Sequence, residues 1–295
     1  MRTAIQRSAF VREIEKTIAK HVAYFILVKQ KPDSAGPIAS ASGTMIRIGQ
    51  YHFILTADHI IDALGNVPGK LALIVPSGTK NQFRFPVSGL KFKFSRFETQ
   101  SERALYDVAA LKLPQHIVDS LENSRFAQLD QVSLKPGSKN YTFTGMPAAY
   151  GEVTAERFSK ILERTQVDVR CGTLCYRTTP CSRKNIPSDA DLTNHFYLRE
   201  KRGTLLKSSP AYKTTDGKTP RLGGMSGAGI WKFKKSEGVP TGIRLVGIET
   251  DAHHGRYLKC SRIELALRLI YRDYPTLPDP LKFYKGGKSK ILVPR

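Results

Sequence analysis

Three short stretches of this 295-residue chain carry residue types that could form a nucleophilic catalytic site. Ser226 lies inside the glycine-rich segment 223–229, and His59 and Asp107 precede it, each beside an apolar run. A serine hydroxyl is a poor nucleophile at neutral pH until a neighbouring base removes its proton. Imidazole has an ordinary pKa close to that task, and a buried carboxylate fixes its tautomer and stabilises the imidazolium. The three residues therefore predict a His59, Asp107 and Ser226 triad.

The glycines around Ser226 predict a tight turn that could stabilise a developing oxyanion. Glycine reaches backbone angles that other residues adopt only at a cost, so a turn at Gly224 is readily formed. Such a turn could point the N–H groups of Gly224 and Ser226 at one oxygen. Donors of this kind each lower a barrier by about 2.7–4 kcal/mol, so these two N–H groups are the predicted oxyanion hole.

The order His, Asp, Ser along the chain resembles that of the trypsin/chymotrypsin-like serine peptidases, in an intracellular, bacterial-type form. The resemblance runs from residue 22 to residue 272. It implies a mainly β fold with two six-stranded Greek-key β-barrels, the active site between them, and helices at both ends of the chain. Besides the triad, it is carried by the hairpin before the histidine, the strand that opens the second barrel and the strand pair after the serine: residues 43–57, 141–147, 230–233 and 245–250.

Two positions depart from the pattern of that family. Extracellular members usually carry an Asp before the serine, which binds a new N-terminus released by zymogen cleavage, but here the residue is Met225. The resemblance therefore implies an enzyme without that activation switch. Asp58 lies beside His59, where a small residue is usual. A carboxylate facing the site would raise the pKa of His59, but alternation along a strand is expected to turn Asp58 away from the ring.

The same resemblance implies where a substrate would bind. Thr250, Asp251 and Ala252 are expected to form an edge that pairs with the substrate backbone as an added strand. Thr250 also takes the place of a serine whose hydroxyl supports the catalytic Asp. Arg221 lies in the expected floor of the specificity pocket, where no Asp is present. Glu249 in the pocket wall would favour a basic substrate side chain, whereas Arg221 would favour an acidic one, and the sequence does not decide between them.

The sequence predicts which segments of the chain position these residues. A helix capped by Ser8 is predicted in the first segment, because Phe10, Ile14 and Ile18 recur at four-residue spacing and would place one face on the barrel. The predicted parts are an N-terminal helical extension at 1–21, a peptidase domain at 22–272 with subdomains at 22–130 and 131–272, an insert around 152–219, and a basic C-terminal tail at 273–295.

Cysteine usage and hydropathy indicate the compartment. Four cysteines are too few for a disulfide-dense secreted protein, and no apolar run reaches the 18 or more residues of a membrane span. We therefore expect a cytoplasmic protein that does not bind membranes. Four cysteines could hold zinc, but their spacing lacks the usual two-residue knuckle, so free thiols, with no metal and no cofactor, are preferred. The cysteines are Cys171, Cys175, Cys181 and Cys260.

The formal net charge of +22 indicates a partner of opposite charge. A basic surface attracts nucleic acid or another polyanion through its phosphates, although such charge can also serve solubility and a basic tail can simply be solvated. The chain could thus be a catalytically silent, protease-like scaffold that binds nucleic acid or peptide. The intact triad favours instead a serine endopeptidase that acts through an acyl-enzyme on a restricted protein substrate, with a regulatory partner as one means of gating.

Overall fold

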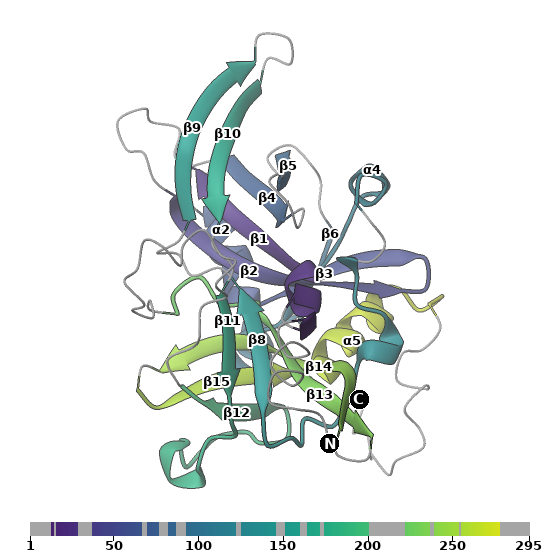
Figure 1. Cartoon of the computed structure of the whole chain (residues 1–295), viewed down its shortest axis with the longest axis vertical. Helices are drawn as coiled ribbons and strands as arrows, with labels where there is room; N and C mark the ends of the chain where they lie inside the picture. Colours follow the sequence, from purple (N-terminus) through teal and green to yellow (C-terminus); the bar gives the residue numbers. More distant parts are fainter. Residues whose placement is uncertain are drawn as a thin grey trace.

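Two antiparallel β-sheets dominate the computed structural model of this protein (Figure 1). The structure describes residues 13–14, 16–28, 37–66, 70–76, 82–86, 93–121, 125–145, 151–159, 164–171, 174–200, 222–236, 239–253 and 255–277. Few helices accompany the sheets, so the predicted mainly β fold with two β subdomains is confirmed. In this part of the chain, no helix is both long and apolar enough to span a membrane.

The first sheet has seven strands in the order β5-β4-β1-β2-β3-β7-β6, where six were expected. Its strands are β1 (Val22–Val28), β2 (Pro37–Ile48), β3 (Tyr51–Thr56), β4 (Lys70–Pro76), β5 (Gln82–Pro86), β6 (Lys93–Ser95) and β7 (Ala109–Lys112). A two-residue turn joins β2 to β3, and Gly49 takes a φ of 59° there. Tight hairpin turns require such left-handed backbone, which glycine adopts readily. This hairpin leads directly into the segment that carries His59.

The second sheet has six strands in the order β11-β8-β13-β14-β15-β12. These strands are β8 (Tyr141–Gly145), β11 (Leu174–Thr178), β12 (His195–Arg199), β13 (Gly229–Ser236), β14 (Val239–His253) and β15 (Tyr257–Arg262). An isolated antiparallel bridge between Pro180, two residues after β11, and Leu198 of β12 brings the two ends of the sheet together. β11 and β12 lie within the predicted insert, yet they pair with β8 and β15. That part of residues 152–219 therefore belongs to the second sheet.

The remaining described elements are a hairpin and short helices. The hairpin of β9 (Gly151–Ser159) and β10 (Arg164–Cys171) extends away from both sheets at the top of Figure 1. The helices are α2 (Asp58–Asn66), α3 (Gln100–Tyr106), α4 (Gln115–Val118) and α5 (Ile263–Asp273), with 3-10 turns η2 (Leu129–Gln131) and η4 (Arg183–Asn185).

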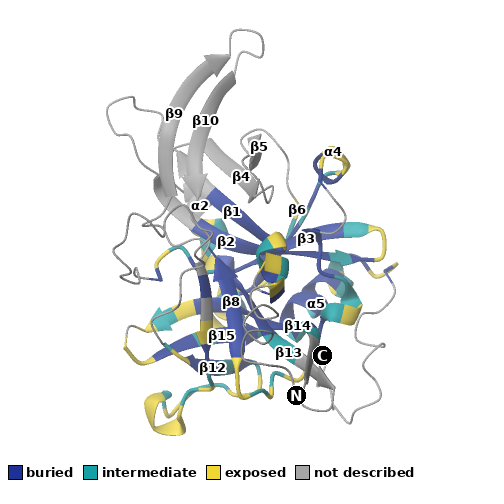
Figure 2. Cartoon of the chain, viewed as in Figure 1, coloured by how far each residue is buried: buried dark blue, intermediate teal, exposed yellow. Residues whose placement is uncertain are grey.

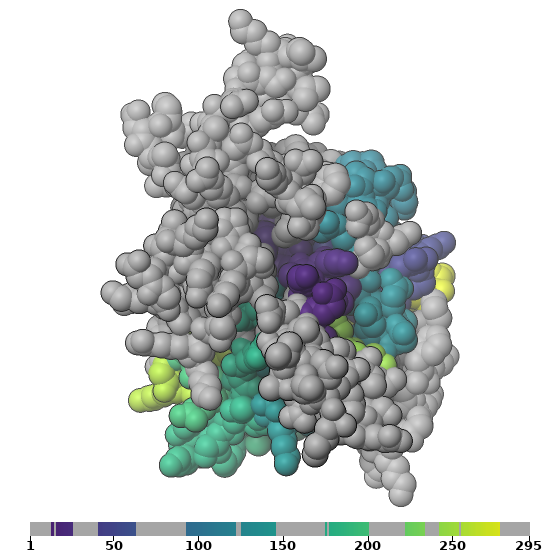
Figure 3. Space-filling view, viewed as in Figure 1, coloured from purple at the N-terminus to yellow at the C-terminus, as the bar shows by residue number. Residues whose placement is uncertain are grey.

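One hydrophobic core joins the two sheets to α5. Buried residues of β2 and β3 meet those of β13, β14 and α5 in this cluster, which Figure 2 shows as dark blue at the centre of the molecule. Ile14 and Ile18 also lie in it, which confirms that this face of the N-terminal helix packs on the sheets; Phe10, on the same predicted face, lies outside the described residues. Figure 3 shows the described N-terminal residues, in purple, at the surface near the middle of this face.

The cysteines whose side chains are described are free thiols. Cys175 and Cys260 are buried and Cys181 is partly exposed. The backbone of Cys171 ends β10. Within the described residues, no three His, Cys, Asp or Glu side chains gather as a candidate metal site. The basic tail lies outside the described residues beyond position 277.

Candidate active site

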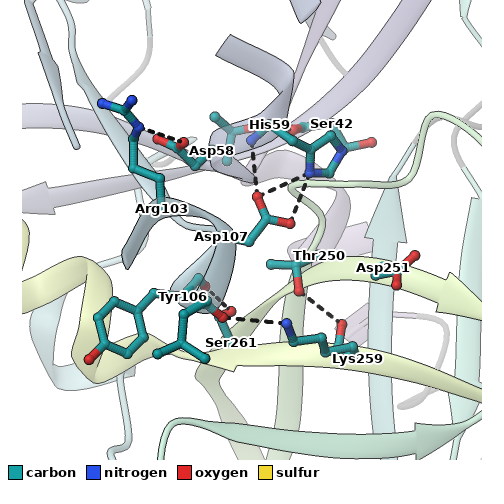
Figure 4. Close-up of polar contacts among 12 residues, drawn as sticks. Ser42, Asp58, His59, Arg103, Tyr106, Asp107, Thr250, Asp251, Lys259 and Ser261 are labelled. Carbon is teal, nitrogen blue, oxygen red and sulfur yellow. Dashed lines mark hydrogen bonds and ion pairs between the residues drawn. The ribbon is translucent and has the colours of Figure 1, made fainter. Parts of the chain in front are cut away.

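His59 and Asp107 are in direct contact, although they are far apart in the sequence. The ring Nδ1 of His59 lies 3.0 Å and 2.9 Å from the two carboxylate oxygens of Asp107, and the backbone N–H of His59 donates to Oδ1 at 3.0 Å (Figure 4). An ionised carboxylate only accepts hydrogen bonds, so Nδ1 carries the proton in the neutral ring. The other ring nitrogen, Nε2, is therefore the basic one. The His59 side chain is 48% exposed and that of Asp107 is 14% exposed, which leaves the ring open to a substrate.

Helix ends bring these two side chains together. His59 lies in the first turn of α2, where backbone N–H groups lack partners within the helix and the helix dipole favours a negative charge. The carboxylate of Asp107 supplies an acceptor for the His59 N–H and a negative charge at this end of the helix. Asp107 itself follows the last residue of α3 with φ 45° and ψ 49°, and it is the only described residue other than glycine with a positive φ. Aspartate tolerates this left-handed conformation better than most residues. The chain then turns directly into β7.

The charges around His59 favour its protonated form. Burial lowers the pKa of His59, but the hydrogen bond and charge of Asp107, followed by the charges of Asp251 and Asp58, outweigh burial and raise the pKa above its ordinary value of 6.5. A raised pKa makes the neutral ring a stronger base.

Asp58 points away from His59, as expected, but for a different reason. It begins helix α2 rather than continuing the strand. Its carboxylate is nearly buried and accepts two hydrogen bonds from Arg96, at 2.6 Å and 2.8 Å, with Arg103 4.0 Å away (Figure 4 shows the Arg103 contact). Buried charges are tolerated when they are paired in this way. The Asp58–Arg96 pair thus fixes the start of the helix that carries His59.

Ser226 lies in a turn that rests on the strands leading to His59. The backbone N–H of Ser42, in β2, donates to the carbonyl of Ser226 at 2.9 Å, and the hydroxyl of Ser42 donates to the carbonyl of Gly224 at 3.0 Å. The hydroxyl of Thr56 donates to the Ser42 carbonyl at 2.9 Å. Thr56 precedes His59 by three residues, so one chain of hydrogen bonds links the serine turn to the histidine segment.

The serine turn also depends on the absence of a side chain at Gly227. A Cβ atom there would lie 1.9 Å from the carbonyl oxygen of Ser42 and 2.4 Å from the Thr56 hydroxyl, and the φ of Gly227 is 94°. Both the contact and the left-handed backbone exclude other residues. The N–H of Gly227 donates to the Glu249 carbonyl at 2.8 Å, which ties the turn to β14 as well.

The N–H groups of Gly224 and Ser226 lie in the same turn. Gly224 has a φ of 88°, which is the backbone freedom expected of this position. No hydrogen bond inside the described part of the chain uses the N–H of Gly224 or of Ser226. Met225 between them is fully buried in the hydrophobic core of the second sheet. Its side chain is thereby directed away from the surface of the turn.

The predicted substrate-binding residues divide between buried and exposed positions. Asp251 is exposed and pairs with His253 at 2.9 Å, and Ala252 is partly buried against the second core. Thr250 is buried, and its hydroxyl donates to the Lys259 carbonyl at 3.3 Å rather than to Asp107 as the sequence suggested. Arg221 lies outside the described residues.

Glu249 is a buried acid beside the serine turn. It is 1% exposed, and its Oε2 has no hydrogen-bond partner within the described residues. Burial, followed by the charges of Asp251 and Asp107, raises the pKa of Glu249 to about 8. At neutral pH its protonated form therefore predominates.

Sequence reasoning missed Ser42 and Arg96. Ser42 is one of several small polar residues in β2, and Arg96 follows the three-residue strand β6. Neither position carries a local motif, since each becomes important only through a partner that is distant in the sequence. The Asp beside the histidine was the one signal that could have pointed to a buried arginine partner.

Comparisons with known proteins give limited information. No family model matches the chain, and no curated protein matches it. A solved structure titled "Crystal structure of Deg5" aligns with 91% of this chain and 95% of its own, with a TM-score of 0.45 and 13% sequence identity.

Proposed function

We propose that this protein is a serine endopeptidase in which His59, Asp107 and Ser226 act together. The observation that carries the proposal is the two-point contact of Asp107 with His59, on the N–H and on Nδ1. This contact fixes the ring and leaves Nε2 as the base, which is the function of the acid in a serine triad. The hydrogen bonds from Ser42 hold the serine turn against the same strands and so support a shared site.

The proposed reaction forms and then breaks an acyl-enzyme. Nε2 of His59 takes the proton of the Ser226 hydroxyl as Oγ attacks the substrate carbonyl carbon. The oxygen of that carbonyl becomes negative and is stabilised by the N–H groups of Gly224 and Ser226. The protonated His59, stabilised by Asp107, then gives its proton to the leaving amine as the peptide bond breaks. Water, deprotonated by the same ring, hydrolyses the ester and regenerates the serine.

The free edge of β14 supports a peptide as the substrate. β13 pairs with β14 only as far as Ile248, whereas β15 pairs with β14 out to His253. Within the described residues, Asp251 and Ala252 thus have a strand partner on one side alone. An extended peptide can add to such an edge through its backbone. We propose that this edge receives a restricted protein substrate, while the basic chain as a whole attracts a polyanionic partner.

The rate of the reaction should fall in acid with a midpoint above pH 6.5. His59 must be neutral to act as a base, and its pKa is raised above that value. As the pH falls through this raised pKa, the ring is protonated and activity is lost. A profile of kcat/KM against pH, or of the rate of fluorophosphonate labelling, measures this midpoint. A midpoint well below 6.5 would contradict the proposed charge environment of the ring.

The uncut chain should be reactive without release of a new N-terminus. Met225 is buried among apolar side chains, so the turn is held by packing where an ion pair with a new amino group would otherwise be required. Intact-mass spectrometry of fluorophosphonate-treated protein should show the adduct on the full-length mass. Labelling confined to a shortened chain would show instead that cleavage activates the protein.

The competing interpretation is a silent scaffold that binds nucleic acid or peptide. It predicts that a fluorophosphonate leaves the folded protein unmodified and that peptides bind without being cleaved. The proposed peptidase predicts one covalent adduct that depends on His59. A single labelling experiment therefore separates the two functions.

A further inference from the structure

Helix α3 ends at the residue before Asp107, and its last residue, Tyr106, packs partly buried against the hydrophobic core that joins the two sheets. None of its residues is buried. At its start, Thr99 accepts a hydrogen bond from the N–H of Glu102 at 3.1 Å, and the Glu102 carboxylate accepts one from the N–H of Thr99 at 3.2 Å. This capping box fixes only the first turn. The last turn, and hence Asp107, is held by the packing of Tyr106 and by polar contacts to the carbonyls of that turn.

Strand β15 of the second sheet supplies those contacts. The hydroxyl of Ser261 donates to the carbonyl of Tyr106, and the ammonium group of Lys259 lies 3.4 Å from the carbonyl of Leu105 (Figure 4). Leu105 and Tyr106 are the last two residues of α3. The last carbonyls of a helix have no partner inside the helix, and a cation there is favoured by the helix dipole. The second sheet thus binds the end of a helix that belongs to the first half of the chain.

Ser261 and Lys259 lie in a strand that is paired on both sides. Ser261 is fully buried and pairs with Ile248 of β14 and with His195 of β12. Burial, followed by the Lys259 charge, lowers the pKa of His195, while the Asp191 charge and hydrogen bonds to the backbones of Asp191 and Leu105 act in the opposite direction. The backbone of Lys259 lies opposite that of Asp251 in the register of β15 with β14. The end of α3 is therefore held against a strand that has paired neighbours on both sides.

We propose that Ser261 and Lys259 are positioning residues that hold the carboxylate of Asp107 against His59. Asp107 takes a left-handed backbone directly after the two carbonyls that they bind, so a shift of these carbonyls would carry Asp107 with it. The inference deepens the proposed function and rests on it for the activity readout. The titration of His59, by contrast, reports the Asp107 contact whether or not the protein cleaves peptides.

The first test replaces Ser261 with alanine. If Asp107 moves away, His59 loses the hydrogen bond and charge that raise its pKa, while burial still lowers it; the charges of Asp58 and Asp251 remain. We expect the pKa of His59, followed by proton NMR of its ring in the full chain, to fall in Ser261→Ala. The acidic limb of kcat/KM should move to lower pH in parallel. kcat should fall by about tenfold to a hundredfold, since a misplacement of about 1 Å can cost 10²-fold, with little change in KM.

A matched control and a second variant separate positioning from general damage. Ser95 is also a buried serine, its hydroxyl has no partner within the described residues, and Ser95→Ala removes the same atom. It should leave kcat and the His59 titration unchanged. Lys259 is partly exposed, so Lys259→Met tests the inference even where Ser261→Ala fails to fold. Loss of a positive charge alone would raise the pKa of His59. A fall in the pKa of His59 in Lys259→Met therefore has to come from a displacement of Asp107. Lys259→Arg keeps the charge and should show the wild-type pKa of His59.

Two results would overturn the inference. One is a fall in kcat in folded Ser261→Ala and Lys259→Met with an unchanged His59 titration, because the two residues would then act only on stability. The other is no change in either quantity. If the wild-type protein cleaves nothing, the proposed function fails, but the expected shift in the His59 titration still decides the positioning role.

Discussion

Replacement of Ser226, His59 or Asp107 by alanine is expected to remove nearly all peptide hydrolysis. In serine triads, loss of the serine or the histidine lowers kcat by about 10⁶-fold and loss of the acid by about 10⁴-fold. The three groups act as a unit, so the double and triple variants should be hardly slower than Ser226→Ala. Measurement of kcat and KM on one cleaved peptide, for all combinations of the three changes, tests both the size of the losses and their failure to add.

The control for these variants is His116→Ala. His116 is an exposed histidine in α4 and has no part in the proposed reaction. This variant should keep wild-type kcat. Undiminished cleavage by folded Ser226→Ala would contradict the assignment of the nucleophile, and additive losses would contradict a common mechanism.

Substitution of Gly227 by alanine is expected to be the most damaging change outside the three reacting side chains. The added Cβ would lie 1.9 Å from the Ser42 carbonyl oxygen, a backbone atom that cannot move aside alone. Overpacking costs about 1–3 kcal/mol and a left-handed backbone about 1–3 kcal/mol more, so we expect Gly227→Ala to lose about 3 kcal/mol of unfolding free energy. The displaced turn should also slow fluorophosphonate labelling of Ser226. Denaturant unfolding and labelling rates measure the two effects.

Gly242→Ala provides the comparison for that change. Gly242 lies in β14, and an added Cβ there would meet nothing within 4 Å. Glycine gives the unfolded chain more conformational freedom than alanine does. Gly242→Ala should therefore leave the free energy of unfolding unchanged or raise it slightly. Equal stability of Gly227→Ala and the wild-type protein would show that the turn can relax away from Ser42.

The sequence predicted the parts of the site that are local in the chain. The hairpin before His59, the turn glycines at Gly224 and Gly227, and the strand after Ser226 all carry motifs of their own, and the structure has them. The mainly β fold was expected from the family resemblance that those motifs carry.

The parts of the fold and of the site that could not be predicted depend on contacts between residues that are distant in the sequence. Ser261 meets Tyr106 across 155 positions of sequence, and Ser42 meets Gly224 across 182. A lone serine in a strand has no pattern that indicates its partner. For the same reason β11 and β12 were assigned to an insert, since short strands are recognised as part of a sheet only through the strands they pair with.

The proposed triad is tested most directly by reaction of the full-length protein with a fluorophosphonate, followed by peptide mapping in a mass spectrometer. An ordinary serine hydroxyl is too weak a nucleophile to react at an appreciable rate, whereas one activated by a neighbouring base does. We expect a single adduct on Ser226, and no adduct in His59→Ala. A folded wild-type protein that stays unmodified, or an adduct that persists in His59→Ala, would contradict the proposed triad.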